Sequence, residues 1–286
     1  RHSRLDVLDC TPAQLQLLLD TGLLEATDGV PKTVLIGGEA IPPAMWQRLS
    51  QCTQIAFLNV YGPTECTVDV TVSALRPDAP LPTLGQPLAN VRLTLLDRRC
   101  RPVPAGVIGE LMVGGIQVAR GYLHRQGLSA ERFVPDPFAE QPGQRMYRTG
   151  DLARWRADGV LEFVGRNDDQ IKLRGFRIEL ADIQAALLRC DGVRAAVVIA
   201  HDDGHGDVRL VAYWVGTAAD RAGDSLRRQL SAQLPDYMVP NVYLQLDALP
   251  LNANGKLDRQ ALPPPEAAIV DADGYVPPAN AIERAL

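Results

Sequence analysis

The sequence predicts an α/β fold that continues into a β-rich, barrel-like region and is followed by a smaller α+β domain. Three observations lead to this prediction. Short apolar runs alternate with helical patterns up to about residue 80, strand-like segments between Gly and Pro extend to about residue 164, and a helix–strand–strand–helix pattern starts at residue 180. Alternating strands and helices indicate a sheet covered by helices, whereas short strands between turn residues indicate a barrel or an antiparallel sheet.

The first predicted helix begins at Thr11, because a hydroxyl followed by proline is a typical helix start. Gly22 suits its end. The apolar face of this helix is a stripe of three leucines, Leu15, Leu18 and Leu19. Residues 34–36 and 56–58 are short apolar runs, which predict buried strands on either side of a connecting segment.

The later elements follow from the same periodicities. Leu226, Leu230 and Leu234 recur at every fourth position, which predicts one apolar helix face. Three successive prolines from residue 263 predict an extended linker. The predicted elements after residue 81 are strands at 91–96, 109–113, 195–200 and 208–215 and helices at 180–190 and 225–234.

Composition and charge exclude several classes of function. A net charge of -5, from 29 basic and 34 acidic residues, argues against general nucleic-acid binding. No apolar run approaches the roughly 18 residues of a membrane span, so no membrane partner is expected. The five cysteines and four histidines fit no zinc spacing and need no disulfide, which favours a cytoplasmic protein. The first four residues lack the apolar core of a signal peptide and suggest the middle of a longer protein.

Four motifs carry the chemistry. They are Asn-Val-Tyr-Gly-Pro-Thr-Glu at 59–65, Tyr-Arg-Thr-Gly-Asp at 147–151, a charged run at 165–179 and Asn-Gly-Lys at 254–256. The first offers a flat ring at Tyr61 and a hard carboxylate oxygen at Glu65. Magnesium is usually held by one or two carboxylates together with phosphate oxygens, which fits a single glutamate. Asp151 ends a turn where its carboxylate can accept from both hydroxyls of a ribose.

Each motif also has a plainer interpretation. The first is a tight turn with a buried tyrosine and a surface glutamate, and Asp151 is a common turn former. The run at 165–179 is a solvated charged face, and Lys256 is a solvated lysine. Lys256 is not a phosphate-loop lysine, because no glycine-rich strand-to-helix turn precedes it. Hydrolysis by a serine triad is not expected, because no Gly-x-Ser-x-Gly elbow is present.

Together and in this order, the four motifs resemble those of the adenylation domains of nonribosomal peptide synthetases, within the adenylate-forming superfamily. The resemblance also includes residues 109–123 and 234–240 and covers nearly the whole chain. It implies an incomplete α/β core with a β-barrel-like subdomain, followed by a small α+β lid. The implied parts are the adenylation core at 1–167, α/β to about 80 and β-rich to 167, a mobile lid at 168–262, a linker at 263–274 and the start of a peptidyl-carrier domain at 275–286.

The resemblance also implies roles for single residues. Catalysis falls to Lys256, Thr64 and Glu65, with Glu65 as the magnesium ligand, Asp168 is the hinge, and Lys172 and Gly175 belong to the loop used in thioester formation. The implied nucleotide-binding residues are Gly38, Glu39, Asn59, Tyr61, Thr64, Asp151 and Arg166. The implied substrate-pocket residues are Asp9, Leu35, Gly37, Val60, Val68 and Asp69.

The pocket favours glutamine, with glutamate second. Val60, Val68 and Leu35 can pack a short aliphatic stem. Asp9 and Asp69 can accept hydrogen bonds from an amide at its end, whereas a substrate carboxylate beside them would need a compensating cation. A lysine in the missing upstream part of the pocket would reverse this order.

The resemblance implies that an amino acid and ATP form an aminoacyl-adenylate, whose acyl group passes to the phosphopantetheine thiol of a carrier domain in cis. ATP and Mg are the implied cofactors. A condensation domain of the same synthetase is an implied partner, and the need for a small activator protein stays open. The family's phosphate loop precedes residue 1, so we expect the chain alone to be inactive. The alternatives are an acyl-CoA synthetase-like ligase and a non-catalytic interaction fragment.

Overall fold

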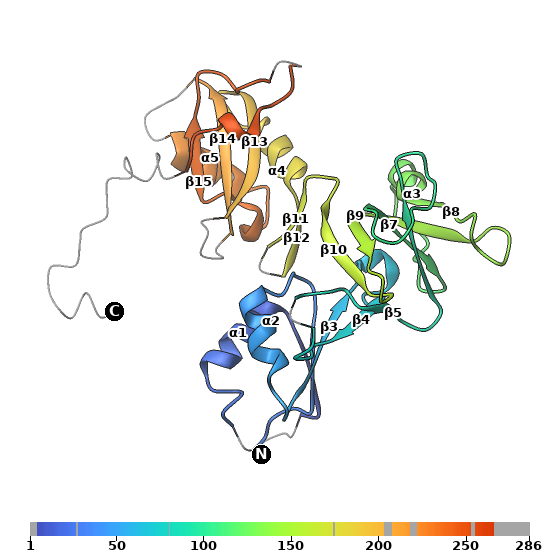
Figure 1. The fold of residues 1–286 in the computed structure, drawn as a ribbon. Coiled ribbons are helices and arrows are strands. Elements are labelled where there is room, and N and C mark those ends of the chain that lie inside the picture. Colours follow the sequence, from blue (N-terminus) through green and yellow to red (C-terminus); the bar gives the residue numbers. More distant parts are fainter. Residues whose placement is uncertain are drawn as a thin grey trace, which may run out of the picture. The chain divides into compact units, whose positions relative to one another are not determined.

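The chain forms two compact units in the computed structural model, and each is described by itself (Figure 1). The first unit comprises residues 1–168 and 172–176, and the second comprises residues 169–171 and those from 177 onward. The structure describes residues 5–26, 28–79, 81–173, 175–202, 208–217, 222–252 and 255–265. Most of the predicted linker and all of the predicted carrier-domain start lie outside the described residues, as does Asn254 of the Asn-Gly-Lys motif.

The first unit begins with a mixed five-stranded sheet. Its strands are β1 (Val7–Cys10), β2 (Thr33–Ile36), β3 (Ala56–Tyr61), β4 (Thr71–Ala74) and β5 (Gln86–Pro87), in that order. Strands β1, β2 and β3 are parallel, and β4 and β5 are antiparallel to their neighbours. The predicted strands at 34–36 and 56–58 are therefore confirmed. The second is longer than predicted, because pairing with β4 extends β3 to Tyr61.

Two helices contribute to one apolar cluster with this sheet. They are α1 (Pro12–Asp20) and α2 (Pro43–Ser50), and their buried side chains include Leu15, Leu19 and Trp46. The start of α1 is as predicted. The Thr11 hydroxyl accepts from the Gln14 N–H at 3.3 Å, and the Gln14 side chain accepts from the Thr11 N–H at 3.0 Å. This reciprocal cap satisfies two donors that the helix start would otherwise leave unpaired.

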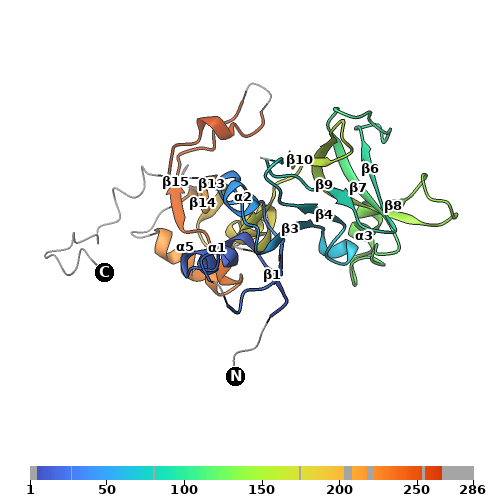
Figure 2. The same cartoon turned by 60° about the horizontal axis from the view of Figure 1, so that its bottom comes forward.

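A second, antiparallel sheet completes the first unit and forms an open, barrel-like layer beside β4 and β5 (Figure 2). Its strand order is β10 (Leu161–Arg166), β9 (Arg145–Trp155), β7 (Gly109–Gly115) and β6 (Val91–Leu96), with β8 (Phe133–Pro135) also paired to β9. The short helix α3 (Gln126–Arg132) precedes β8. The buried cluster of this layer contains Leu111, Tyr147 and Leu161, and it also takes in Tyr61 and Cys66 from the end of the first sheet. The two layers therefore share a core at the Tyr-Gly-Pro-Thr-Glu motif.

The second unit is an α+β domain with a three-stranded sheet. Strand β14 (Val208–Gly216) is central, with β13 (Val193–Asp202) antiparallel and β15 (Val242–Gln245) parallel to it. The helices are α4 (Leu180–Leu187) and α5 (Ala222–Ser231), and short 3₁₀ turns η2 (Asp236–Met238) and η3 (Arg259–Ala261) follow. The helix predicted at 180–190 is present as α4, and its Ile183, Ala186 and Leu187 are fully buried.

Both predicted helices of the second unit end earlier than the sequence suggested. After Leu187 the N–H groups of Arg189 and Cys190 bond three residues back rather than four, which tightens the last turn. Helix α5 ends at Ser231, so Leu234 lies beyond it. Pro235 explains this end, because proline disfavours the α conformation of the residue before it.

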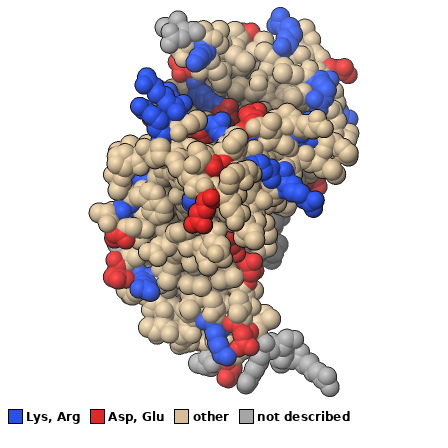
Figure 3. All heavy atoms as spheres, turned by 90° about the vertical axis from the view of Figure 1, so that its right-hand side faces the viewer, with Lys and Arg blue, Asp and Glu red and all other residues tan. Residues whose placement is uncertain are grey.

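The remaining regular element is a two-stranded sheet of β11 (Gln170–Leu173) and β12 (Phe176–Glu179), whose residues are divided between the two units. No helix within the described part of the chain is long and apolar enough to cross a membrane. On the face drawn in Figure 3, basic and acidic side chains are interspersed over a mostly uncharged surface.

Candidate functional site

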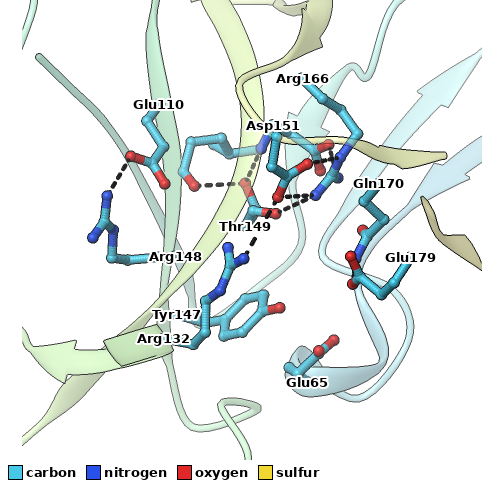
Figure 4. A network of polar contacts seen from close by, with 12 residues as sticks. Glu65, Glu110, Arg132, Tyr147, Arg148, Thr149, Asp151, Arg166, Gln170 and Glu179 are labelled. Carbon is cyan, nitrogen blue, oxygen red and sulfur yellow. Dashed lines mark hydrogen bonds and ion pairs between the residues drawn. The ribbon is translucent and has the colours of Figure 1, made fainter. Parts of the chain in front are cut away.

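Asp151 is the centre of a buried polar cluster in the first unit (Figure 4). It lies within β9, opposite Arg166 of β10, and is 5% exposed. Its carboxylate accepts from the Tyr61 hydroxyl on one oxygen and from the Arg166 guanidinium on the other. Its backbone N–H donates to the Thr149 hydroxyl at 2.9 Å, which in turn donates to the Leu111 carbonyl. A carboxylate with a donor on each oxygen has one fixed orientation.

Burial and the neighbouring positive charge act in opposite directions on the pKa of the Asp151 carboxyl. Burial raises the pKa of the Asp151 carboxyl, and the positive charge of Arg166 and the Tyr61 hydrogen bond oppose that rise. Burial also raises the pKa of the Tyr61 phenol far above its ordinary value, and the negative charge of Asp151 adds to this. The phenol is therefore a permanent donor toward the carboxylate at neutral pH.

Arg166 joins two carboxylates. Besides Asp151, its guanidinium donates to Asp168 at 2.7 and 3.0 Å and to the Thr149 carbonyl at 3.0 Å. Arg132 of α3 lies 3.6 Å from the same Asp168 carboxylate. Gly150 allows the Asp168 carboxylate to lie this close to the backbone, because a Cβ at residue 150 would lie 2.4 Å from an Asp168 oxygen. Gly150 also has a positive φ of 76°, which suits glycine. The predicted ribose residue and the predicted hinge residue are thus linked through one arginine.

Glu65 lies in the 3₁₀ turn η1 (Thr64–Cys66) and is only 8% exposed, although its neighbour Thr64 is exposed. The Tyr122 hydroxyl donates to the Glu65 carboxylate at 2.5 Å, and the Tyr147 hydroxyl lies 3.2 Å from that of Tyr122. Tyr122 was missed by sequence reasoning. It belongs to the motif at 109–123, so a signal was present, but nothing local relates that motif to Glu65.

The single carboxylate of Glu65 fits a hard divalent cation whose other ligands come from water or from phosphate oxygens. The described residues contain no group of three or more His, Cys, Asp or Glu side chains that could form a metal cage. A single buried carboxylate suits Mg²⁺, which keeps several ligands from water or phosphate. Transition metals and Ca²⁺ prefer more protein ligands.

Two other predicted nucleotide contacts have partners within the first unit. The Asn59 amide is buried and donates to the Thr83 carbonyl at 2.7 Å. The ammonium of Lys172 lies 5.4 Å from the centre of the Tyr61 ring, which is predicted to contact adenine. Tyr61 itself is buried at the end of β3 rather than presented on the turn.

Glu39 and Gly175 come together, although they are 136 residues apart and were predicted for different steps. The Gly175 N–H donates to the Glu39 carboxylate. Gly175 has a positive φ of 82°, as does Gly38 next to Glu39 with a φ of 84°. Glycine is suited to both positions, because other residues rarely adopt this conformation.

Four of the predicted substrate-pocket positions lie in or directly after β1, β2 and β3, whereas Val68 and Asp69 lie between η1 and β4. Asp9 pairs in register with Leu35. A Cβ at Gly37 would lie 2.9 Å from a methyl group of Val60, so these two residues face each other directly.

Asp69 and Asp9 also lie close together. The pKa of the Asp69 carboxyl is raised by burial and by the negative charge of Asp9. Val68 differs from the other pocket positions, because it is 62% exposed and has a positive φ of 74°. That conformation is strained for a β-branched residue.

Lys256 belongs to the second unit. It is exposed at the tip of a tight hairpin, where its N–H donates to the Asn252 side chain and Gly255 has a positive φ of 71°. An ion pair between Arg259 and Asp169 lies nearby. A cavity of about 360 Å³ is lined by Asp169, Gln184, Ala196, Val197, Leu249, Lys256, Leu257 and Arg259.

Comparisons with known proteins identify the family. The family described as AMP-binding enzyme matches residues 1–123, and the AMP-binding enzyme C-terminal domain matches residues 182–256. The chain is 50% identical over 234 residues to the dimodular nonribosomal peptide synthase of Bacillus subtilis (strain 168), covering 82% of this chain and 10% of that protein. It is 48% identical over 284 residues to the isonitrile lipopeptide synthase of Mycobacterium tuberculosis (strain ATCC 25618 / H37Rv), covering 98% of this chain and 11% of that protein.

Solved structures give the same result. Holo-PA1221, described as an NRPS protein containing adenylation and PCP domains bound to a vinylsulfonamide inhibitor, matches with a TM-score of 0.76 and 30% identity over 90% of this chain and 44% of that one. IdnL1 matches with a TM-score of 0.74 and 30% identity over 86% of this chain and 51% of that one. The chain therefore spans about half the length of these structures and about a tenth of the two synthases.

Proposed function

Because the chain belongs to the AMP-binding enzymes, as a fragment of an adenylation domain of the nonribosomal peptide synthetase type, we propose that it serves the ATP-dependent activation of an amino acid as an aminoacyl-adenylate. The observation that carries this proposal is the buried cluster of Tyr61, Asp151 and Arg166. A buried carboxylate between two fixed donors is suited to accept hydrogen bonds from the two hydroxyls of a ribose. The positive charge of Arg166 opposes the rise in the pKa of the Asp151 carboxyl that burial causes, and so favours the ionised form, which can act only as an acceptor.

The phosphate end of the nucleotide is assigned to the turn that follows β3. Thr64 offers an exposed hydroxyl, and Glu65 would hold Mg²⁺ through its carboxylate. The bound metal would neutralise negative charge on the phosphate oxygens during attack by the amino-acid carboxylate. Lys256 provides a cation for the same developing charge, as its exposed position at a hairpin tip allows. Gly38, Glu39 and Asn59 complete the proposed nucleotide set.

Glutamine is the proposed substrate. The raised pKa of Asp69 beside Asp9 supports this choice, because the two carboxylates already repel each other. A substrate amide would donate hydrogen bonds to them, whereas a glutamate carboxylate would add a third negative charge. Leu35, Gly37, Val60 and Val68 are the proposed lining for the aliphatic stem. A lysine from another part of the complete pocket would shift the preference to glutamate.

Transfer of the acyl group to the phosphopantetheine thiol of a carrier domain in cis completes the proposal. The similarity to PA1221, a protein that contains adenylation and PCP domains, supports a carrier partner. Asp168 is the proposed hinge of a lid that extends to residue 262, with Lys172 and Gly175 on the loop used for transfer. A condensation domain is a proposed further partner. All five cysteines are free thiols, which supports a reducing, cytoplasmic compartment.

ATP–pyrophosphate exchange with the complete adenylation domain tests the proposal against all twenty amino acids. Glutamine is expected to give the highest rate, and Asp151→Ala is expected to lower the rate at subsaturating ATP. A best substrate that is aromatic or branched aliphatic would contradict the pocket assignment. Thioester formation from a fatty or aryl acid and free coenzyme A, without amino-acid exchange, would favour the acyl-CoA synthetase alternative. Nucleotide binding without either reaction would favour the alternative of a non-catalytic interaction fragment.

A further inference from the structure

Tyr122 makes a short hydrogen bond to the proposed magnesium ligand. Its hydroxyl donates to Oε1 of Glu65 at 2.5 Å, within the range of charge-assisted O–H···O⁻ bonds, which are about twice as strong as neutral ones. We propose that Tyr122 is a positioning residue that fixes the orientation of the Glu65 carboxylate for Mg²⁺. The inference rests on the proposed function, in which Glu65 is that ligand.

The main chain of the same segment holds Glu65 as well. The Ala119 N–H donates to the Glu65 carbonyl at 2.8 Å, and the Thr67 hydroxyl donates to the Gln117 carbonyl at 2.8 Å. Residues 117–122 therefore contact the 3₁₀ turn through both backbone and side chain. This gives a role to the motif at 109–123, which the proposed nucleotide and substrate contacts do not use.

Tyr122 is itself fixed by its neighbours. Its N–H donates to the Ser129 hydroxyl at 2.8 Å, and that hydroxyl donates to the Arg125 carbonyl at 2.8 Å within α3. The Tyr122 ring packs edge-on against Phe133, with ring centres 5.3 Å apart. Gly121 allows the close approach, because a Cβ there would lie 2.9 Å from the Ser129 hydroxyl. The position of Tyr122 is thus fixed by its contacts with Ser129 and Phe133, as well as by its bond to Glu65.

Orientation matters at this site because the protein supplies few ligands. Mg²⁺ demands near-ideal octahedral geometry, and the described residues contain no group of three or more His, Cys, Asp or Glu side chains that could hold it. The direction of the Glu65 carboxylate therefore decides how well this geometry is met. Hydrogen-bonding partners of metal ligands typically change metal affinity ten- to a hundredfold when they are removed.

The test compares Tyr122→Phe with wild type in the complete adenylation domain by titration calorimetry. The first probe is a non-hydrolysable ATP analogue with Mg²⁺, and the second is a metal-free sulfamoyl analogue of the aminoacyl-adenylate. Tyr122→Phe is expected to raise the Kd of the Mg²⁺–nucleotide about ten- to a hundredfold. The Kd of the sulfamoyl analogue should stay within about twofold. In exchange assays, the Mg²⁺ concentration for half-maximal rate should rise, with most of kcat recovered at high Mg²⁺.

Three further variants make the outcome decisive. Tyr243→Phe is the matched control, because it removes a buried hydroxyl of the second unit that has no hydrogen-bond partner among the described residues, and it should change neither Kd. Ser129→Ala should shift the Mg²⁺ dependence in the same direction as Tyr122→Phe but less. Glu65→Gln should abolish the Mg²⁺-dependent gain in nucleotide affinity.

Suppose that Glu65→Gln abolishes the Mg²⁺-dependent gain in nucleotide affinity. If Tyr122→Phe then weakens the binding of both probes equally, or of neither, Tyr122 does not position Glu65, and Glu65 remains the Mg²⁺ ligand. If Glu65→Gln leaves the Mg²⁺ dependence intact, both assignments fall. Thermal unfolding of each variant shows whether it still folds. If Tyr122→Phe does not fold, the Mg²⁺ dependence of Ser129→Ala distinguishes the same outcomes.

Discussion

The hydroxyl of Tyr61 donates to the carboxylate of Asp151, which lies 90 residues later in the chain. The residue predicted to contact adenine and the residue predicted to contact the ribose are therefore one buried unit rather than two separate contacts. Nucleotide binding and the stability of the first unit consequently depend on the same hydrogen bond. Substitutions in this pair are expected to change both.

Tyr61→Phe should destabilise the first unit by about 1–3 kcal/mol at pH 7, because the buried Asp151 carboxylate loses a donor. The cost should fall as the pH is lowered. Burial raises the pKa of Asp151 above 3.8, and loss of the phenol should raise it further. When folding raises the pKa of an acid, the folded state loses stability as the pH rises through that pKa. This penalty is absent below the pKa of the unfolded state. Urea unfolding at pH 7 and pH 5 measures the difference, with Tyr243→Phe as the control. An equal loss at both pH values would contradict this account.

Asp69→Asn should stabilise the first unit at pH 7 by a few tenths to about 1 kcal/mol, the range of partly exposed charge pairs. The pKa of Asp69 is raised by burial and by Asp9, so the folded state binds more protons than the unfolded state just above pH 3.8. The charge penalty is therefore present at neutral pH and disappears as the pH approaches 4. Thermal unfolding from pH 7 to pH 4 follows the gain. Asp78→Asn, at an exposed aspartate, should give no comparable gain.

Gly37→Ala should destabilise the first unit by about 1–3 kcal/mol, the usual cost of overpacking. The added Cβ would lie 2.9 Å from a Val60 methyl group and 3.2 Å from the Val60 carbonyl oxygen. A second substitution, Val60→Ala, should recover part of the loss, because only the methyl contact is relieved. Chemical unfolding of the two single variants and the double variant measures the coupling. Gly127→Ala, where the new Cβ meets nothing within 4 Å, is the control and should not destabilise. Additive effects of Gly37→Ala and Val60→Ala would show that the two sites do not pack together.

Lys256→Ala should lower adenylate formation by about two orders of magnitude, the usual effect of losing one transition-state contact. Transfer from supplied aminoacyl-adenylate to the carrier thiol should change much less. Pyrophosphate exchange and single-turnover loading of the carrier domain separate the two half-reactions. Lys32→Ala, at an exposed lysine paired with Asp6, should leave both unchanged. Equal losses in the two half-reactions would remove the proposed role of Lys256.

The elements that the sequence predicted well have local causes. Thr11 and Pro12 start α1 through a cap that is complete within four residues, and the apolar runs of β2 and β13 are visible as sequence alone. The ends of α4 and α5 were predicted too late, because hydrophobic periodicity continues past the residue where backbone bonding changes. Pro235 was the available signal for α5.

The contacts of the candidate site have long-range causes. Tyr122 reaches Glu65 across 57 residues, Asn59 bonds to Thr83 across 24, and Gly175 bonds to Glu39 across 136. No local pattern encodes such pairs, because they depend on how the two sheets of the first unit share one core. The motifs could therefore predict which residues belong to the site, but not which hydrogen bonds join them.

Strand β1 lies at an edge of its sheet, and within the described part of the chain β2 is its only paired strand. Its outer backbone groups are thus available to another strand, and Leu5 and Val7 beside them are each 55% exposed. Open strand edges with apolar side chains favour intermolecular pairing. The chain of residues 1–286, prepared by itself, is therefore expected to self-associate as its concentration rises. Light scattering over a dilution series would detect this, and Val7→Lys should suppress it.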